Sequence, residues 1–505
     1  MAVEKVIESY KVQADKEEVE INILEKRHEL VNEYNVNIPE IGAGTQALLL
    51  ELKNSLISVR GAMSEKISDP DQINEMKKNF AREAEKQIKA RMPKADQKTV
   101  NDLTAVLMHE MLGLGKLEIM LSDPNLEEIV VNQSDAPVWV YHKKYGWLKS
   151  NIFVEPEEQI ENYANIIARR IGKQITTLNP LLDAHLITGD RANATLYPIS
   201  SNGNTITIRM FRRDPWTVSE LIENNTVSAE LMATLWEAIQ YELNIIFSGG
   251  TASGKTTILG ICLPFIPPNH RMISIEDTRE LRAPEFLHWV PLTTREPNPE
   301  GKGGVSMLDL LVNSLRMRPD RIIVGEIRRQ REAEVLFEAM HTGHSAYTTV
   351  HANTAQETIR RLVNPPISVP LTMLDAVHLN VVMFRNRKIG SRRVLHVAEF
   401  IPEKRGVTEE VVKTNLIFRW SPAKDQIRKQ NESIRLFDEL GLHTGMNVME
   451  IKKEILEKQK ILDWMVDKKI KDVNSVGRVV AEYYNDPDRV IEIVRKNQDF
   501  KKIIE

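Results

Sequence analysis

The residues most able to do chemistry form the stretch Gly249 to Thr256, which reads Gly-Gly-Thr-Ala-Ser-Gly-Lys-Thr. Its spacing fits the P-loop pattern G-x-x-x-x-G-K-[ST], whose glycines let backbone N–H groups turn toward phosphate oxygens. Lys255 is expected to reach the β- and γ-phosphates of a nucleotide, and the Thr256 hydroxyl to ligate Mg²⁺. The predicted nucleotide-binding residues are Gly249, Gly250, Thr251, Ala252, Ser253, Gly254, Lys255, Thr256 and Thr257.

The segments on either side of this loop are of the kinds that the chemistry requires. Residues 244–247 are an apolar run typical of a buried strand, and residues 256–266 have the pattern of an apolar helix that ends at Pro267 and Pro268. A strand, a glycine-rich loop and a helix in this order place the helix N-terminus at the phosphates, so the sequence predicts binding of a nucleoside triphosphate.

Acidic residues follow two later apolar runs. Residues 272–275 lead to Glu276 and Asp277, and residues 321–324 lead to Gly325 and Glu326. In a doubly wound sheet, ligands bind at the carboxyl ends of the strands. We therefore predict that Glu276 orients or deprotonates the attacking water and that Asp277 caps a helix N-terminus. Glu326 has the Walker B position and is expected to hold Mg²⁺, directly or through water.

Three histidines lie close together in the sequence after these acidic residues. His341 and His344 precede an apolar strand, and His351 ends that strand, so His351 is expected to face the same crevice as Glu326. A histidine there could sense the γ-phosphate or support the water, although a lone histidine is more often structural. Zinc binding is not favoured, because no further ligand type lies nearby.

Arginines before the P-loop are candidates for arginine fingers. Arg209 lies on a predicted strand and Arg191 directly precedes another, and we interpret both as groups that act across a subunit boundary. For Arg212 and Arg213 the alternative of surface ion pairs stays equally open. The candidate catalytic residues are Glu276, Glu326, His351, His344, Arg191, Arg209 and Arg212.

Changes in composition divide the chain into five segments. From about residue 231, strands alternate with helices, which predicts a parallel sheet with right-handed crossovers. The segments are an N-terminal helical module over 1–95, an α+β domain over 96–215 that supplies the arginines, a linker over 216–230, a RecA-like P-loop ATPase domain over 231–400 with helices on both faces of its sheet, and a mostly helical C-terminal extension over 401–505.

Composition narrows the class of protein. The chain has 505 residues and a formal net charge of −4, which argues against a general nucleic-acid coat. Its one cysteine, Cys262, excludes an internal disulfide and a multi-cysteine zinc site. No N-terminal signal core and no long apolar run is evident, so a cytoplasmic protein that meets the membrane through a partner is expected.

The motifs together resemble the type II/type IV secretion-system ATPase family. They are GGTASGKTT, SIEDTREL, RPDRIIVGEIR and MHTGHSAYTTVHANTA, in that family's order, with GDRANATLYPIS and TITIRMF before the P-loop. The resemblance covers about residues 100–400. Within the family the chain looks most like the archaeal ATPases that assemble and drive archaella and archaeal type IV pili. It departs from many bacterial members in having no tetracysteine zinc module.

This resemblance carries several implications. It implies ATP hydrolysis with Mg²⁺, a homo-hexameric ring, and a location at the inner face of the cell membrane on a polytopic platform protein, with accessory archaellum or pilus proteins. It also implies that Glu276, Glu326, His344 and His351 line the active site. Three alternatives from other classes are a RecA-like nucleic-acid translocase or DNA-transfer ATPase, a small-molecule kinase and a non-hydrolysing nucleotide switch. The 6% aromatic content argues against the stacked-base groove of a translocase, and no nucleic acid is expected as a partner.

Overall fold

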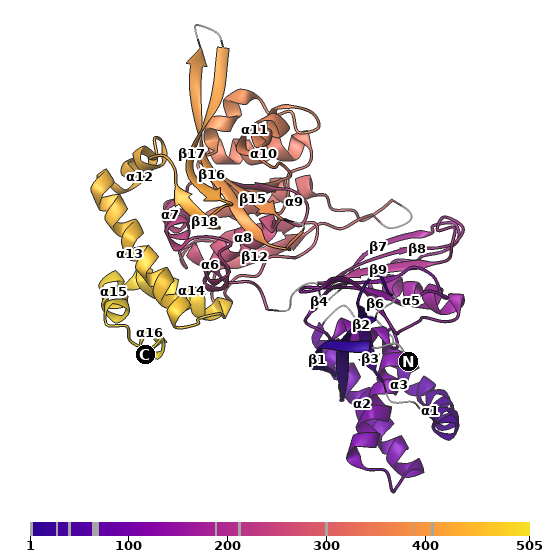
Figure 1. Ribbon diagram of the computed structural model, residues 1–505. Coiled ribbons are helices and arrows are strands. Elements are labelled where there is room, and N and C mark those ends of the chain that lie inside the picture. The colour runs from indigo at the N-terminus through magenta and orange to yellow at the C-terminus, as the bar shows by residue number, and fades with distance from the viewer. Residues whose placement is uncertain are drawn as a thin grey trace. The chain divides into compact units, whose positions relative to one another are not determined.

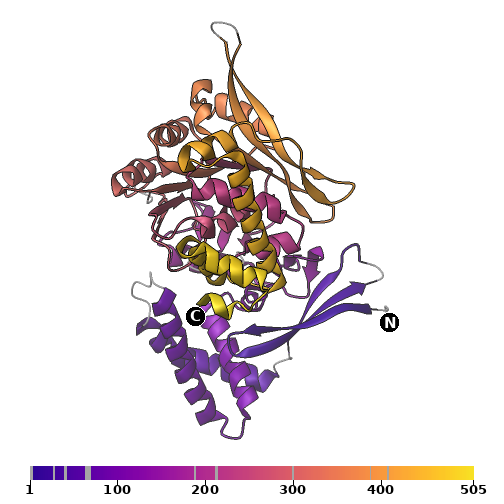
Figure 2. The ribbon, with the colours of Figure 1, turned by 90° about the vertical axis from the view of Figure 1, so that its left-hand side faces the viewer.

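The protein divides into two compact units, Met1–Arg213 and Asp214–Glu505. Each unit contains its own sheet, and in the described part of the chain each sheet has nine strands (Figures 1 and 2). This computed structural model describes residues 4–26, 29–38, 42–62, 70–186, 189–210, 214–297, 301–386, 388–405 and 409–504.

The sheet of the first unit is mostly antiparallel, and its strand order is β1-β2-β3-β6-β5-β4-β9-β8-β7. The pairing of β3 with β6 is parallel. Its strands are β1 (Glu4–Ala14), β2 (Glu17–Lys26), β3 (Glu33–Asn37), β4 (Leu126–Val131), β5 (Trp139–His142), β6 (Gly146–Ser150), β7 (Leu181–His185), β8 (Arg191–Thr195) and β9 (Thr205–Arg209).

The prediction of a helical module over 1–95 is wrong for its first part, because β1, β2 and β3 extend the sheet of the α+β domain. The cause is visible in β2, where Val19, Ile21 and Ile23 are buried and alternate with exposed or half-exposed polar side chains. A charge-rich composition concealed this period of two, which is the period of a strand. Tyr10 of β1 and Tyr34 of β3 both donate to the buried Asp123, at 2.7 and 2.8 Å, which fixes the added strands to the unit.

Helices follow the strands of the first unit. α1, α2 and α3 pack together around buried leucine, phenylalanine and methionine side chains such as Leu52, Phe80 and Met108. The helices of this unit are α1 (Ala43–Ala62), α2 (Pro70–Arg91), α3 (Gln97–Leu112), α4 (Leu117–Leu121) and α5 (Glu157–Arg170).

The sheet of the second unit has the order β12-β11-β13-β14-β10-β15-β16-β17-β18. Neighbouring strands from β12 to β15 are parallel, and those from β15 to β18 are antiparallel. The strands are β10 (Ile245–Gly249), β11 (Met272–Glu276), β12 (Trp289–Thr293), β13 (Arg321–Val324), β14 (Ser345–Val350), β15 (Leu379–Arg385), β16 (Arg392–Arg405), β17 (Glu409–Ser421) and β18 (Gln426–Lys429).

Central strands of this sheet are buried on both faces. Ile245 and Phe247 of β10 point into one apolar core, whereas Ile246 points into the other. Because successive side chains of a strand point to opposite faces, an unbroken apolar run requires a layer of helices on each side. The RecA-like α/β class with helices on both faces is therefore confirmed.

One face of the sheet is covered by α7, α8 and helices from the C-terminal part of the chain, and the other face by α9, α10 and α11. α6 lies within the stretch that we predicted to be a linker. The helices up to β15 are α6 (Val218–Glu223), α7 (Ala229–Gln240), α8 (Lys255–Cys262), α9 (Met307–Ser314), α10 (Gln330–His341) and α11 (Ala355–Val363), with short 3-10 turns at η1 (Leu263–Phe265), η2 (Leu315–Met317) and η3 (Leu371–Ala376).

Residues 401–429 continue the sheet through β16, β17 and β18, so the predicted helical extension begins later than residue 401. The long β16–β17 hairpin projects beyond the helices of its unit in both views (Figures 1 and 2). The helices that follow are α12 (Leu436–Thr444), α13 (Val448–Asp467), α14 (Val473–Asn485), α15 (Pro487–Arg495) and α16 (Lys501–Ile504).

These C-terminal helices belong to the core of the second unit. Trp236 of α7 stacks on Phe265 and donates its indole N–H to the hydroxyl of Tyr484 in α14 at 2.8 Å. Beside it, Lys458 of α13 forms an ion pair with Glu237, and both side chains are fully buried. A buried charge is tolerated only with a partner, so this pair fixes how α13 packs on α7.

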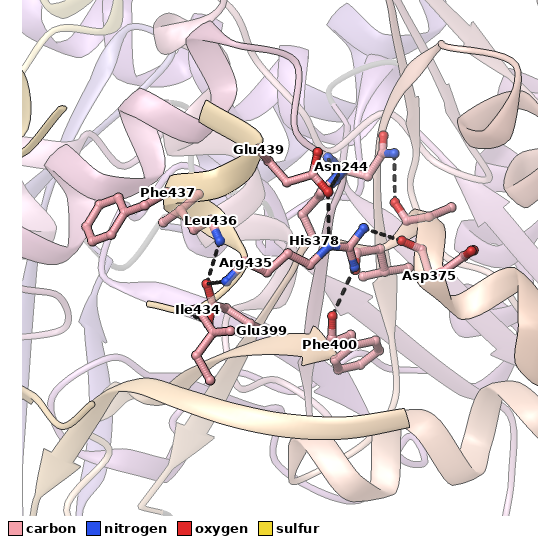
Figure 3. Close-up of polar contacts among 12 residues, drawn as sticks. Asn244, Asp375, His378, Glu399, Phe400, Ile434, Arg435, Leu436, Phe437 and Glu439 are labelled. Carbon is pink, nitrogen blue, oxygen red and sulfur yellow. Dashed lines mark hydrogen bonds and ion pairs between the residues drawn. The ribbon is translucent and has the colours of Figure 1, made fainter. Parts of the chain in front are cut away.

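A polar network attaches the start of α12 to the sheet (Figure 3). The buried carboxylate of Glu399 in β16 accepts hydrogen bonds from the backbone N–H groups of Ile434, Arg435 and Leu436. The Arg435 guanidinium donates to the carbonyls of Val377, Phe400 and Asp375. The chain before α12 is thus held from both sides by hydrogen bonds, most of which are partly buried.

No helix among the described residues combines the length and the apolarity that crossing a bilayer requires.

Candidate nucleotide site

Four parallel strands bring the sequence-predicted groups to one edge of the second sheet. Val324 of β13 lies between Ile275 of β11 and Thr348 of β14, and Ser248 of β10 is in register with Val350 of β14. The carboxyl ends of these strands therefore meet, and the chain continues there into four groups of predicted site residues. They are Gly249 with the P-loop, Glu276, Glu326 and His351.

The chain can leave β10 in this conformation only with glycine at the last position of the strand. Gly249 has φ 154°, and a Cβ there would lie 2.7 Å from the carbonyl oxygen of Met383 on the neighbouring strand β15. Gly254, with φ 97°, is the residue before α8, which begins at Lys255. The unpaired backbone N–H groups of the first turn of α8 thus open onto the loop, which is the usual arrangement of a phosphate site.

The Lys255 ammonium is folded back onto its own loop. Its Nζ donates to the carbonyl oxygens of Gly249 and Gly250 at 3.1 and 2.9 Å, and lies 3.3 Å from Nδ1 of His351. Burial lowers the pKa of Lys255, although the carboxylate of Glu326 opposes this shift. Phosphate oxygens could replace these neutral carbonyls as partners and would stabilise the charged amine more strongly.

Glu326 is at the centre of a short polar chain. Its Oε1 lies 3.3 Å from Nε2 of His351, and its Oε2 accepts from the Arg328 guanidinium at 2.8 Å. His351 therefore touches both the P-loop lysine and the Walker B carboxylate. Burial and the adjacent Lys255 charge lower the pKa of His351, which favours the neutral imidazole at neutral pH.

Glu276 is a buried carboxylate, and only one of its two oxygens has a hydrogen-bond partner among the described residues. Its Oε1 accepts from the backbone N–H groups of Glu280 and Leu281 at 2.9 and 3.1 Å. Its Oε2 is buried and has no hydrogen-bond partner among the described residues. Burial raises the pKa of the Glu276 carboxyl to about 7. A carboxylate that can exchange a proton near neutral pH and has a free oxygen is suited to orient a water molecule.

The structure does not bring all predicted site residues together. His344 precedes β14, at the opposite end of that strand from His351, and its ring contacts Thr342 and Ala339 at the end of α10. Arg191 and Arg209 lie in the first unit, where they are direct partners across β8 and β9. Arg212 and Arg213 lie outside the described residues.

Asp277 does not cap a helix, so that prediction is wrong. No helix starts at this point; the chain continues as a bend and irregular backbone. The Asp277 carboxylate instead accepts from the Arg328 guanidinium at 2.8 Å and from the Thr294 hydroxyl at 3.2 Å.

Two arginines at the site were missed by the sequence reasoning. Arg328 bridges Asp277 and Glu326, and Arg392 of β16 donates to the carbonyl of Ala252 in the P-loop at 3.1 Å. Arg328 stands two residues after the Walker B glutamate, which could have signalled it. Arg392 comes from an antiparallel strand far along the chain, and no local pattern indicates its contact.

The donor groups at this edge fit a nucleotide with Mg²⁺ better than a metal bound by protein alone. In the described ranges, no group of three histidine, cysteine, aspartate or glutamate side chains could hold an ion. Mg²⁺ typically takes one or two protein oxygens and completes its shell with phosphates and water. Thr256 at the start of α8 and Glu326 at the end of β13 are two such donors.

The fold and this edge define the class of P-loop nucleotide-binding proteins with a RecA-like sheet. A family model described as "Type II/IV secretion system protein" matches residues 183–386. An uncharacterized protein of Methanocaldococcus jannaschii is 38% identical over 386 residues, which are 75% of this chain and 69% of that protein. The "Probable conjugal transfer protein TrbB" of Sinorhizobium fredii is 32% identical over 266 residues, covering 50% of this chain and 76% of that protein.

Among solved structures, the VirB11 ATPase of the Brucella suis type IV secretion system is 24% identical; the match covers 55% of this chain and 90% of that chain, with a TM-score of 0.29. On the family match and these relatives, the chain belongs to the type II/IV secretion system ATPase family.

Proposed function

We propose that the chain is an ATP-hydrolysing motor that powers the assembly of an archaeal type IV pilus-like filament or archaellum. In an archaellum, the motor would also drive rotation of the filament. The observation that carries the proposal is the meeting of three groups at one sheet edge: the Lys255 loop, the Glu326–His351 pair and Glu276 with its free buried oxygen. A nucleotide-binding protein without hydrolysis has no need of two acidic strand ends beside the loop.

In this mechanism each group of the chain has one task. Residues Gly249–Thr257 and the first turn of α8 hold the phosphates, and Lys255 exchanges its loop carbonyls for β- and γ-phosphate oxygens. Thr256 and Glu326 would hold Mg²⁺, which neutralises charge on the phosphates when bound. Glu276 orients the attacking water with its free oxygen and takes its proton, while His351 links Lys255 to Glu326.

Arginines of the first unit are proposed to complete the site of a neighbouring copy. Arg191 and Arg209 lie side by side at one end of β8 and β9, so the two positive charges share one face of the sheet. Such a pair suits the charge that develops on a transferring phosphoryl group. Arg212 stays a further candidate, and His344, being at the other end of β14, is proposed to act only if another subunit approaches that end.

The remaining parts of the proposal concern the assembly. We propose a homo-hexameric ring at the cytoplasmic face of the cell membrane, docked on a polytopic platform protein with accessory pilus or archaellum proteins. The similarity to a protein of the archaeon Methanocaldococcus jannaschii supports an archaeal system. Loss of the γ-phosphate would release the arginines and let the first unit rotate as a rigid body.

Substitution of Lys255 tests the proposal. Lys255→Ala is expected to abolish Mg²⁺-dependent ATP hydrolysis, because the β- and γ-phosphates lose their cation. Lys460→Ala, which removes an exposed lysine of α13, is the matched control and should hydrolyse ATP like the unmodified protein. Glu276→Gln should still bind ATP and fail to cleave it, which chromatography of the bound nucleotide would show. Normal turnover in Lys255→Ala contradicts the assignment of the site.

The similarity to TrbB supports a second candidate, a DNA-transfer ATPase. The two functions differ in how the ATPase rate responds to DNA. A motor for a filament should hydrolyse ATP at the same rate with and without single- or double-stranded DNA, whereas a DNA-transfer ATPase should be stimulated. Measuring the rate at several salt concentrations separates specific stimulation from general charge effects.

A further inference from the structure

Arg328 is the last residue of the stretch RPDRIIVGEIR, whose pattern assigns it no role. It lies on the loop between β13 and α10, and 56% of its side chain is exposed. Its Nη2 donates to Oε2 of Glu326 and its Nη1 to Oδ2 of Asp277, each at 2.8 Å. One guanidinium thus joins two carboxylates from the ends of neighbouring strands β13 and β11.

This contact leaves neither oxygen of Glu326 without a partner. Oε2 is taken by Arg328, and Oε1 lies 3.3 Å from the His351 ring. A divalent cation needs carboxylate oxygen as a ligand, directly or through its water shell. A guanidinium on Oε2 opposes cation binding at Glu326 by charge repulsion and by occupying that oxygen, so the cation binds more readily once Arg328 moves away from Glu326.

Asp277 offers a place for Arg328 after that release. Its second oxygen accepts from the Thr294 hydroxyl at 3.2 Å, so its orientation does not depend on Glu326. The guanidinium can therefore give up one carboxylate and keep the other. An exposed arginine has the freedom for such a movement, since its side chain is not held by packing.

Building on the proposed function, we propose that Arg328 is a positioning residue that competes with the catalytic Mg²⁺ for Glu326 and is retained by Asp277 when the cation binds. Without a cation, Arg328 offsets part of the negative charge of the two adjacent carboxylates and keeps Glu326 aimed at the site. When the cation is bound, the Arg328 guanidinium contacts Asp277 alone.

The two partners of Arg328 then have opposite effects on cation affinity. Removing the guanidinium in Arg328→Gln frees Glu326, so the affinity should rise by about two- to fivefold, the usual range for one exposed ion pair. Asp277→Asn leaves Arg328 with Glu326 alone, so the affinity should fall. Arg328→Lys should lie between Arg328→Gln and the unmodified protein, because one ammonium cannot bridge both carboxylates in the same way.

The experiment titrates Mn²⁺ into the full-length protein with saturating ADP and follows free Mn²⁺ by electron paramagnetic resonance. Arg331→Gln removes an equal charge from an exposed position on α10 and is the control for a general field effect. In the double variant with Arg328→Gln, Asp277→Asn should have no further effect if it acts through Arg328. Superimposable titrations of Arg328→Gln and Arg331→Gln would overturn the inference, as would an undiminished effect of Asp277→Asn in the double variant.

Binding of a fluorescent ADP analogue in EDTA separates this failure from failure of the proposed function. If the unmodified protein binds the analogue and Lys255→Ala does not, the nucleotide site stands and the Mn²⁺ titrations judge Arg328 alone. If the unmodified protein binds no analogue, the proposed function fails and the role of Arg328 fails with it.

Discussion

Glu276 shows how burial sets the properties of a single residue at this site. Only 3% of it is exposed, and burial raises the pKa of its carboxyl to about 7, against 4.5 for an ordinary glutamate. The folded protein therefore binds a proton between these pH values that the unfolded chain does not bind. Stability from this group is fully present below about pH 4.5 and is lost as the pH rises toward 7.

We predict that Glu276→Gln is more stable than the unmodified protein at pH 8, and that the difference disappears toward pH 4.5. At pH 8 the ionised carboxylate destabilises the fold by up to roughly 3 kcal/mol, which an uncharged amide avoids. Thermal unfolding of both proteins at several pH values measures the difference. An equal difference at every pH would mean that the carboxyl does not titrate in this range.

Gly249 shows the constraint of space at the same site. A Cβ there would lie 2.4 Å from the Ser253 hydroxyl oxygen and 2.7 Å from the backbone of Met383, so Gly249→Ala must push β10 and β15 apart. We predict a loss of about 2 kcal/mol or more in the free energy of unfolding, together with loss of nucleotide binding. Denaturant unfolding and nucleotide titration are the measurements.

The control is Gly260→Ala in α8. A Cβ on Gly260 would make only an ordinary contact, 3.6 Å from a Leu281 methyl group. Alanine also favours the helix over glycine by up to about 1 kcal/mol, so this variant should be as stable as the unmodified protein or more stable. Equal destabilisation by both substitutions would contradict the role given to Gly249.

The site was predictable from the sequence wherever its residues follow a strand. Glu276, Glu326 and His351 each end an apolar run, and parallel strands bring their carboxyl ends to one edge. His344 lies before its strand and is therefore placed at the other end. Asp277 was misread because its partner, Arg328, comes from a different strand end, and a local pattern cannot show such a contact.

At the scale of elements, the strength of the hydrophobic pattern decided what the sequence could show. The buried strands β10, β11, β13 and β14 were predicted within a residue or two. β12 was missed because it contains Pro291, which is tolerated at this sheet edge but argues against a strand in the sequence.

The attachment of α12 to the sheet is another element-scale feature, and it depends on one carboxylate. Glu399 is fully buried and accepts from Ser433 as well as from the backbone of Ile434 to Leu436. In Glu399→Gln an amide N–H₂ must face these donors, so we predict a loss of about 2–4 kcal/mol in the free energy of unfolding. Hydrogen exchange of residues 434–444 should also become faster.

The matched control lies on the same strand. Glu403 forms an exposed ion pair with Lys413, so Glu403→Gln should change stability by less than about 1 kcal/mol. The proposed role of Glu399 fails if the two substitutions have the same effect on exchange in α12.

For the whole molecule, local sequence patterns could not show which distant segments share a core. The N-terminal strands join the sheet of the α+β domain through Asp123, and the C-terminal helices join the P-loop unit through Lys458 and Glu237. These contacts link residues more than eighty positions apart. The candidate finger arginines and the P-loop lie in two different units.

This division leads to a prediction about subunits. If Arg209 acts on the nucleotide of a neighbouring copy, Arg209→Ala and Lys255→Ala should each be inactive alone, with Arg209→Ala reduced by roughly three to five decades. In mixed assemblies, an intact P-loop from one variant can meet an intact arginine from the other. An equimolar mixture should regain activity at about a quarter of its interfaces, because each interface needs one subunit of each kind in the right order. The ATPase rate after co-refolding or subunit exchange measures this.

Mixing Lys255→Ala with Glu276→Gln is the control, because both damage the same strand-end site and no interface then combines an intact P-loop with an intact Glu276. Should the Arg209→Ala mixture remain as inactive as its components, Arg209 is a structural arginine of β9 and the proposed contact between subunits is wrong.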